Sequence, residues 1–364
     1  FGMKVTTVNG QSVDGNSISF KALEKITVEG EVLDASGQLV TDFTGIVNPT
    51  VKDSKVTVTC LKNSNKDDSP AFTFTDYPNT IFIGNDSVRN GKFSFTFTVP
   101  KDISYSNLQG KMNLYAVDTE SGNEAQGNFD NFIVGGTSDT AETDTIGPEI
   151  RALYLNDTTF VDGGQVNTTP YFVAELWDKS GVNITGSSVG HDMMLVIDES
   201  TVLSYNLNSY YELLLGEDGT GIVKFPIPAL EPGKHTAEFW VWDILNNSTV
   251  RTFTFEVVEG LKPFLFDVIA TPGIAREQVT FHLMHNRPES RMRVGIMVYD
   301  LAGRQLWKHE ESGTSGLFEN YTVSWDLTSG GARMRPGVYI YRAAISSDNS
   351  KDATKARKFI ILGE

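Results

Sequence analysis

Apolar and polar residues alternate with a period of two along most of this chain. Alternation of this kind, rich in β-branched and aromatic residues and bounded by Gly, Asn, Asp and Pro turns, is typical of half-buried β-strands. The clearest examples are residues 26–33, 92–99, 237–242 and 252–257. Helical periodicity of useful length is not found in the sequence. The pattern therefore predicts an all-β chain.

Two interruptions of this pattern divide the chain into three parts. A small, polar and acidic run at residues 135–145 lacks any apolar period and is typical of an exposed linker. A second break falls at Glu259 and Gly260, just before Lys262 and Pro263. We therefore predict three consecutive immunoglobulin-like β-sandwich domains: residues 1–136, then a linker at 137–146, then residues 147–259 and 260–364.

The middle part has the strand and turn order of a bacterial immunoglobulin-like sandwich. Alternate residues of its strands should point inward, which predicts burial of Trp177, of Phe239 or Trp240, and of Phe253 or Phe255. The segment 243–248 reads as a turn in which an Asn takes the left-handed conformation.

Charge and length exclude several classes of function. The 364 residues carry 46 acidic and 30 basic side chains, a formal net charge of -16. This balance disfavours a nucleic-acid partner, whose phosphates require clustered Lys and Arg. No apolar run approaches the roughly 20 residues that a membrane-spanning helix requires. The chain begins without an initiator Met, and we expect it to be the C-terminal part of a longer protein.

The sequence offers little enzymatic chemistry. Cys60 is the only cysteine, so an intramolecular disulfide is impossible. It lies in an alternating strand pattern at residues 55–61, which predicts a buried or half-buried strand cysteine rather than a nucleophile. Gly-x-Ser-x-Gly elbows and phosphate-binding glycine loops are missing. We expect no catalytic residue and no cofactor in this segment.

One loop, residues 178–192, concentrates small, acidic and histidine residues. A Ca²⁺ site built from Asp178, Asn183 and Asp192 is one interpretation. The other is an ordered turn whose side chains satisfy their own backbone, with His191 and Asp192 capping the next strand. We favour the turn and predict no metal. A zinc site at His282 and His285 is disfavoured, because neither Cys nor an acidic residue lies at ligand spacing.

The last part of the chain resembles the C-terminal sorting domains of the type IX secretion system. The resemblance rests on the order of four motifs: Tyr-Asp-Leu-Ala-Gly-Arg at 299–304, Val-Ser-Trp-Asp at 323–326, Arg-Pro-Gly-Val-Tyr at 335–339, and Lys-Phe-Ile-Ile-Leu at 358–362. The Pro-Asn-Pro-like motif that often begins such domains is replaced by Ala-Thr-Pro-Gly at 270–273. That departure leaves the boundary of the first strand open.

Earlier blocks extend the resemblance to nearly the whole chain. Residues 85–103, 111–116, 147–150 and 178–192 are similar to the region that follows the catalytic domain in the PorU family of type IX sortases. That family implies a gingipain-like cysteine peptidase at the bacterial cell surface, attached to the outer membrane. It cleaves sorting domains from exported cargo and joins the cargo to anionic lipopolysaccharide. Its nucleophile and histidine lie in a domain without counterpart here, so whether this chain belongs to an enzyme is left open.

The resemblance also implies a partner. Residues 260–364 would tether the protein to an outer-membrane β-barrel shuttle protein, while the cargo sorting domains and the lipopolysaccharide would be bound by the missing catalytic domain. The final strand would either dock at a sheet edge or barrel mouth, or form a core strand of a sandwich. The sorting-domain residues expected to contact the partner are Gly303, Pro336, Gly337, Tyr339, Phe359, Ile360 and Ile361.

Two other functions fit stacked all-β domains. One is an adhesin or carbohydrate-binding array, which exposed coplanar aromatic side chains on one sheet face would favour. The other is a fragment of a cargo protease exported by the same route.

Overall fold

The computed structural model describes residues 1–62, 70–139, 144–186, 190–214 and 219–363. Within them nearly all regular secondary structure is β-strand, and the helical element found is the three-residue 3₁₀ helix η1 (Asn208–Tyr210). The all-β prediction is therefore confirmed. No helix of the described part is long and apolar enough to span a membrane.

The chain folds into two compact units. The first comprises Phe1–Ala152, Ala174–Val223 and Ala237–Thr252, and the second comprises Leu153–Val173, Lys224–Thr236 and Phe253–Glu364. The division into three domains at residues 136, 146 and 259 stays a prediction.

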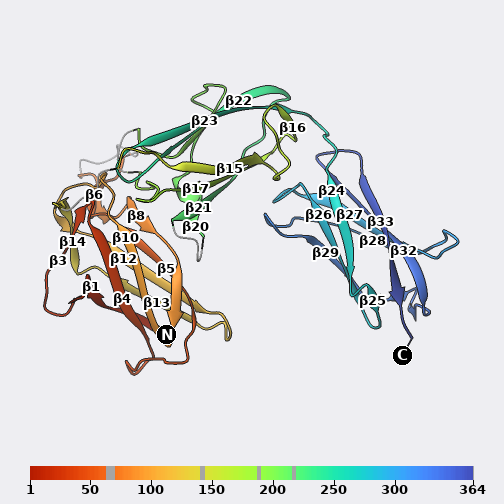
Figure 1. The fold of residues 1–364 in the computed structure, drawn as a ribbon, viewed down its shortest axis with the longest axis horizontal. Coiled ribbons are helices and arrows are strands. Elements are labelled where there is room, and N and C mark those ends of the chain that lie inside the picture. Colours follow the sequence, from red (N-terminus) through yellow and green to blue (C-terminus); the bar gives the residue numbers. More distant parts are fainter. Residues whose placement is uncertain (63–69, 140–143, 187–189, 215–218, 364) are drawn as a thin grey trace. The chain divides into compact units, whose positions relative to one another are not determined.

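The N-terminal strands form a closed barrel (Figure 1). Seven strands follow one another around it, and β12 pairs with both β13 and β5 to close the ring. In order they are β12 (Lys111–Asp118), β13 (Glu124–Phe129), β1 (Gly2–Val8), β4 (Lys25–Leu33), β10 (Lys92–Thr98), β9 (Asp86–Arg89) and β5 (Gly45–Lys52). Two shorter strands extend this sheet, β2 (Gln11–Ser12) beside β1 and β8 (Thr80–Ile83) beside β5.

This closure differs from the open sandwich that the sequence predicted for residues 1–136. Period-two alternation places apolar residues on one face of a strand in either architecture, so it cannot distinguish them. The closing pair runs from Lys111 opposite Lys52 to Asp118 opposite Gly45. A Cβ atom at Gly45 would lie 1.9 Å from the carbonyl oxygen of Val117. The close approach that seals the barrel therefore depends on a residue without a side chain.

The barrel interior is packed with apolar side chains. Phe20, Phe93, Phe95 and Phe97 are buried together with the β-branched residues of β4 and β5. A small sheet with the order β11 (Leu108–Gln109), β14 (Phe132–Thr137) and β3 (Ile18–Ala22) adds Phe132, whose ring stacks on that of Phe20.

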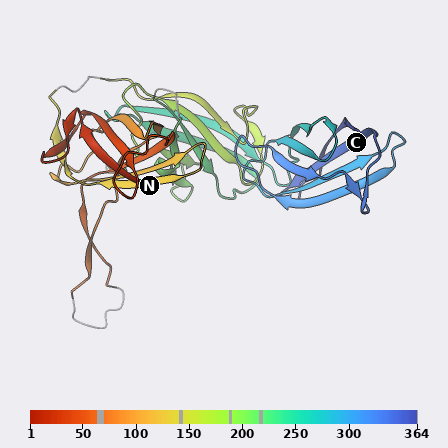
Figure 2. The ribbon, with the colours of Figure 1, turned by 90° about the horizontal axis from the view of Figure 1, so that it is seen from below.

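A two-stranded hairpin, β6 (Val56–Thr59) and β7 (Thr73–Asp76), projects from the barrel (Figure 2). Cys60, Leu61, Phe72 and Phe74 are exposed on it. The prediction that Cys60 is buried or half-buried is wrong, because the hairpin pairs only with itself within the described residues and has no sheet behind it.

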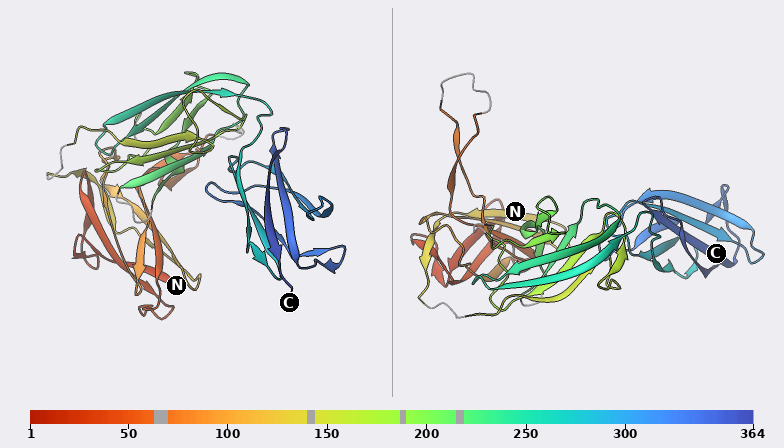
Figure 3. Two further views of the ribbon diagram at one scale, coloured as in Figure 1. Left: turned by 45° about the vertical axis from the view of Figure 1, so that its right-hand side comes forward. Right: turned by 90° about the horizontal axis from the view of Figure 1, so that it is seen from above.

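Residues 149–257 form two sheets (Figure 3). One has the order β15 (Glu149–Leu155), β17 (Tyr171–Trp177), β21 (Thr220–Pro226) and β20 (Tyr211–Leu213). The other has the order β16 (Gly164–Val166), β23 (Ser248–Val257), β22 (Gly233–Trp242), β18 (Met194–Ile197) and β19 (Ser204–Asn206). Phe239, Phe253 and Phe255 are buried as predicted, whereas Trp177 is half-buried under the guanidinium of Arg151. Asn246 takes the predicted left-handed conformation with φ of 73°.

The C-terminal strands also form two sheets around one core. The smaller has the order β24 (Leu265–Thr271), β26 (Val279–His285) and β29 (Tyr321–Trp325). The larger has the order β25 (Ile274–Ala275), β33 (Ala353–Ile361), β32 (Gly337–Ser347), β27 (Met292–Tyr299) and β28 (Gln305–Gly313). The short pair β30 (Thr328–Ser329) and β31 (Ala332–Arg333) completes this region.

One fully buried cation supports the start of this region. The Arg287 side chain is 0% exposed, and its guanidinium donates hydrogen bonds to the carbonyl oxygens of Leu261 and Asn286 and to the hydroxyl of Ser347. Burial lowers the pKa of Arg287 to about 10. Arg287 thereby holds the segment before β24 against the end of β32.

Candidate functional site

A polar cluster in the first unit joins the loop after β10 to two turns of residues 183–246. Asp102 lies at its centre. His191 Nδ1 lies 2.6 Å from Asp102 Oδ2, and Asn246 Nδ2 donates to Asp102 Oδ1 at 2.8 Å. Asn183 Nδ2 donates to Asp102 Oδ2 at 3.4 Å. The backbone contributes one more bond, from the N–H of Lys101 to the carbonyl oxygen of Ile244.

Packing reinforces these contacts. The His191 ring lies against the Trp242 ring with centroids 4.5 Å apart. Asp102 is 9% exposed and Asn183 is 1% exposed, so water competes little for their bonds. This cluster fixes two loops against the barrel, which is a structural role.

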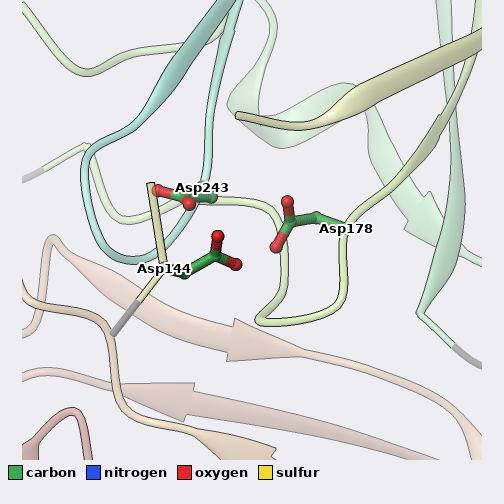
Figure 4. Close-up of side chains that lie close together, drawn as sticks. All are labelled: Asp144, Asp178 and Asp243. Carbon is green, nitrogen blue, oxygen red and sulfur yellow. The ribbon is translucent and has the colours of Figure 1, made fainter. Parts of the chain in front are cut away.

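Three carboxylates gather nearby in the same unit, those of Asp144, Asp178 and Asp243 (Figure 4). One oxygen atom of each lies within 4.8 Å of the others. Backbone and side-chain donors hold each group in place. Asp178 Oδ1 accepts the N–H groups of Ser180 and Gly181 at 2.8 and 2.9 Å.

The other two carboxylates are held by similar turns. Asp243 Oδ1 accepts the N–H groups of Leu245 and Asn247, and Asp243 Oδ2 accepts Asn247 Nδ2 at 2.6 Å. Asp144 Oδ2 accepts the Ser180 hydroxyl at 3.0 Å. The turn geometry thus points all three groups toward one place.

The pKa values of the three carboxyl groups in this cluster are shifted in different directions. Burial raises the pKa of Asp178 to about 6, and the charges of Asp243 and Asp144 add to the rise. Burial likewise raises the pKa of Asp243. The N–H of Ile146 lowers the pKa of Asp144. In the described part of the chain these carboxylates are the residues that could hold a hard divalent cation such as Ca²⁺, which prefers oxygen ligands.

The four predicted loop residues do not form one site. Asp178 belongs to the carboxylate cluster, Asn183 and His191 bind Asp102, and Asp192 Oδ1 accepts Asn208 Nδ2 at 2.7 Å. Residues 187–189 of this loop lie outside the described residues. Sequence reasoning missed Asp102 and Asp144, whose neighbours along the chain give no signal. The Asp-x-x-x-Asn pattern at 243–247 was a readable turn signal for Asp243.

A cleft of about 540 Å³ lies beside the carboxylate cluster within the first unit. Barrel residues such as Phe82, Thr96 and Thr98 form one wall, and Asp178 and Tyr211 contribute to the other. Burial raises the pKa of Tyr211, which keeps its hydroxyl neutral. The cleft therefore combines an aromatic wall with a carboxyl group that titrates near neutral pH.

Cys60 and two of the histidines make contacts that are unrelated to one another. The Cys60 backbone N–H donates to the Phe72 carbonyl oxygen, while His191 and His309 contact Asp102 and Glu311. Among the described residues, no hydrogen bond joins the Cys60 thiol to a histidine.

His285 and Ser315 lie within hydrogen-bond distance, but the position of the ring proton does not suit a catalytic pair. The two side chains lie 2.9 Å apart, and His285 Nδ1 accepts the N–H of Arg287. The ring proton must then lie on Nε2 and point at Ser315 Oγ, so this histidine cannot accept the serine proton. Burial lowers the pKa of His285 to about 4, which keeps the ring neutral.

The expected partner-contacting residues divide between surface and core. Tyr339, Phe359 and Ile361 are buried at 7%, 2% and 1% exposure. Ile360 is exposed, as are Pro336 and Gly337 at the start of β32. Gly303 is exposed at a turn with φ of 83°, a conformation that favours glycine. Their role in partner binding stays a prediction.

The final strand β33 lies inside its sheet rather than at an edge, between β32 and the short strand β25. Its inward residues Phe359 and Ile361 belong to the core of the C-terminal sheets. β33 is therefore a core strand, and its outward-facing side chains are the ones available to contact another molecule.

Aromatic side chains stack both on the surface and in the core. On the hairpin, the exposed rings of Phe72 and Phe74 lie 6.5 Å apart and 20° from parallel, a small exposed pair of the kind that an adhesin would use. The larger array lies inside the barrel. The rings of Phe82, Phe95 and Phe97 lie nearly parallel, within 11° to 22° of one another. Phe95 and Phe97 are buried in the barrel at 3% and 5% exposure. This stack is core packing, so it gives no support to a carbohydrate-binding surface.

Comparisons with known proteins give one informative similarity. Over its full length the chain is 38% identical to dimeric latent PorU from Porphyromonas gingivalis, with a TM-score of 0.44, and it covers 34% of that chain. The chain thus spans about a third of the length of that protein. No family model matches, and a search of curated proteins finds no match.

Two other solved structures are more distant. One is a tetra-tandem repeat in the extending region of a large adhesion protein, with 14% identity, a TM-score of 0.21, and coverage of 99% of this chain and 74% of that one. The other is the Ig1-2 module of the Drosophila receptor protein tyrosine phosphatase DLAR, with 9% identity, a TM-score of 0.24, and coverage of 60% and 100%. At these values neither similarity bears on function.

Proposed function

We propose that this chain is the C-terminal, non-catalytic part of a type IX cell-surface sortase related to PorU. The observation that carries the proposal is the 38% identity to PorU over the whole chain, which includes every strand of both units. In this proposal the complete protein is a gingipain-like cysteine peptidase at the outer membrane. It cleaves sorting domains from cargo and joins the cargo to anionic lipopolysaccharide.

Within that protein the segment has two tasks. Residues 1–259 space the catalytic domain from the surface, with residues 147–259 forming an immunoglobulin-like sandwich. Residues 260–364 are a sorting domain that is retained as a tether to an outer-membrane β-barrel shuttle protein. Cargo and lipopolysaccharide are bound by the catalytic domain, which lies outside this chain.

The contacts of the described residues agree with a non-catalytic role. Asp102, His191 and Asn246 hold loops together, and His285 has its proton on the wrong nitrogen for base catalysis. Gly303, in a turn, and Pro336 and Gly337, at the start of β32, are exposed, so these expected contact residues are available to the protein partner.

Capture of a purified type IX outer-membrane barrel shuttle protein tests the tether. We expect the chain to be retained by the immobilised barrel and the version lacking residues 260–364 to be lost. Pro336→Asp should weaken retention at least about tenfold, because it places a charge at an exposed residue of the expected contact. Thr354→Asp, at an exposed residue of β33 outside the expected contact, is the matched control and should bind normally. Equal retention with and without residues 260–364 would contradict the tether.

A further inference from the structure

The C-terminal region has the opposite charge to the rest of the chain. Residues 260–364 contain 14 basic and 11 acidic side chains, so their net charge is +3. Residues 1–259 contain 16 basic and 35 acidic side chains and carry −19. A negatively charged surface would therefore attract the C-terminal region and repel the remainder.

The larger C-terminal sheet exposes a face that mixes cations with apolar groups. Side chains of β32 and β33 alternate, with Tyr339, Tyr341 and Phe359 inward and their neighbours outward. We call the outward group the basic sheet face, and define it by five exposed residues: Ile274, Val338, Arg342, Lys358 and Ile360.

Strand register places the apolar members side by side. Ile360 pairs with Val338 on β32 and with Ile274 on β25. Their exposed fractions are 36%, 41% and 56%, so three adjacent strands present a continuous apolar row to solvent. Three branched apolar side chains in one exposed row are unusual for a surface without a partner.

The cations of this face are not neutralised by acidic neighbours. Among the described residues, neither Arg342 nor Lys358 forms an ion pair, whereas Lys308 on β28 pairs with Glu310 at 2.9 Å. Lys358 lies two residues before Ile360 on β33, and Arg342 lies four residues after Val338 on β32. Arg342 and Lys358 thus lie on the same sheet face as Val338 and Ile360.

Further cations lie at the end of the sheet where the apolar row is found. Arg276 follows Ile274 closely, and its Nη1 donates to the carbonyl oxygen of Gly363, just after β33. Arg333 donates to the backbone oxygen of Arg276, and Arg335 precedes β32. Glu277 and the terminal Glu364 are the acidic residues next to this group in the sequence. The apolar row is therefore bordered by basic side chains along the sheet and at its end.

We propose that the basic sheet face docks onto an anionic membrane surface, with Arg342 and Lys358 contacting lipid phosphates and the apolar row entering the headgroup boundary. Lys and Arg side chains near an anionic bilayer are attracted to its phosphates, and apolar side chains add a shallow hydrophobic contribution. A protein partner is the less favoured occupant, because the exposed row lies on a sheet face that also carries Arg342 and Lys358, which form no ion pair among the described residues. The proposal rests on the proposed function only in placing this face beside an outer membrane.

Co-sedimentation of the complete chain with lipid vesicles tests this proposal. The vesicles contain phosphatidylcholine alone or phosphatidylcholine with about a third phosphatidylglycerol. We expect binding to the anionic vesicles only, weakened by added NaCl and unaffected by millimolar inorganic phosphate. Arg342→Glu with Lys358→Glu should reduce binding at least about tenfold, because two attractive charges become repulsive. Val338→Ser with Ile360→Ser should also reduce binding while its salt dependence remains.

The matched control reverses two other exposed cations on the barrel, Lys4→Glu with Lys92→Glu, and so produces the same change in net charge. It should bind anionic vesicles like the parent chain. Circular dichroism melting verifies that each variant folds. Equal binding to both vesicle types, or equal losses in the two charge-reversed variants, overturns the proposal. The proposal is also overturned if the variant with Arg342→Glu and Lys358→Glu still binds vesicles but no longer binds the barrel protein, because the basic sheet face is then a protein interface. If the parent chain binds anionic vesicles but is not retained by the immobilised barrel protein, the proposed tether is contradicted and the membrane proposal is not.

Discussion

His191 Nδ1 lies 2.6 Å from Asp102 Oδ2, across 89 positions of sequence. This contact is shorter than the hydrogen bonds that the same carboxylate accepts from Asn183 and Asn246, at 3.4 and 2.8 Å. The loop after β10 thus serves as the attachment point for two turns that are distant in sequence.

Removing this carboxylate should destabilise the first unit. Asp102→Ala leaves the Asn183 and Asn246 amides without their acceptor, and an unsatisfied buried polar group costs about 1–3 kcal/mol. We expect a loss of this size in the free energy of unfolding measured by urea titration. Asp42→Ala, at an exposed carboxylate of the barrel, should change it little. Equal effects of the two changes would show that the cluster contributes nothing to stability.

The carboxylate cluster predicts a pH dependence of stability. The pKa of Asp178 is about 6 in the folded state and close to 3.8 when unfolded. Between these values the folded chain binds a proton that the unfolded chain has lost, so the free energy of unfolding falls as pH rises through this range. Asp178→Asn should remove the fall and make the chain more stable than the parent at pH 7.5, by up to about 3 kcal/mol.

The measurement compares urea unfolding of parent and variant at pH 5 and pH 7.5, with a chelator present to keep divalent cations away from the carboxylates. An unchanged pH profile in the variant would mean that Asp178 is not the titrating group.

Barrel closure should depend on Gly45. An alanine there would bring its Cβ to 1.9 Å from the Val117 carbonyl oxygen, so strand β5 or β12 would have to shift. Overpacking of this kind costs about 1–3 kcal/mol. Gly2→Ala is the matched control in the same sheet, because the nearest atom to its Cβ would be 3.9 Å away. Hydrogen exchange of the β5 and β12 amides should accelerate in Gly45→Ala and remain slow in Gly2→Ala.

The buried Arg287 should be important for the C-terminal region. Arg287→Met retains much of the volume but leaves the Leu261 and Asn286 carbonyl oxygens and the Ser347 hydroxyl without their donor. We expect a loss of at least about 2 kcal/mol in unfolding free energy. Arg291→Ala, which changes an exposed neighbour, should be close to neutral. Thermal unfolding followed by tryptophan fluorescence reports the difference, since Trp307 and Trp325 lie in this region.

The hairpin makes Cys60 accessible. We expect a maleimide reagent to label the native chain nearly as fast as the urea-unfolded chain, because the thiol is exposed. Mass spectrometry measures the rates. Labelling slowed by an order of magnitude or more in the native chain would contradict the exposed position.

The sequence pattern was sufficient to predict strands, because alternation directly reflects which face of a strand is buried. It failed at Cys60 for the same reason. Residues 55–61 alternate like a core strand, yet within the described part of the chain β6 pairs only with β7, and Cys60 is exposed. Alternation reports a sheet-forming segment and does not reveal whether a second layer covers it.

The candidate site was harder to predict, because its residues come from distant parts of the chain. Asp178 and Asp243 each lie in a recognisable turn, whereas Asp144 lies in the segment predicted to be a linker. Loop contacts such as Asp102 with His191 depend on how strands stack, which single-sequence patterns do not encode.

Pairing of β1 with β13 has a consequence for how the barrel is made. Gly2 on β1 pairs with Gln126 on β13, so the barrel sheet is incomplete until these two strands, which are distant in the sequence, have paired. Contacts of such long sequence separation are slow to form, and the incomplete sheet leaves apolar strands open to aggregation in the meantime.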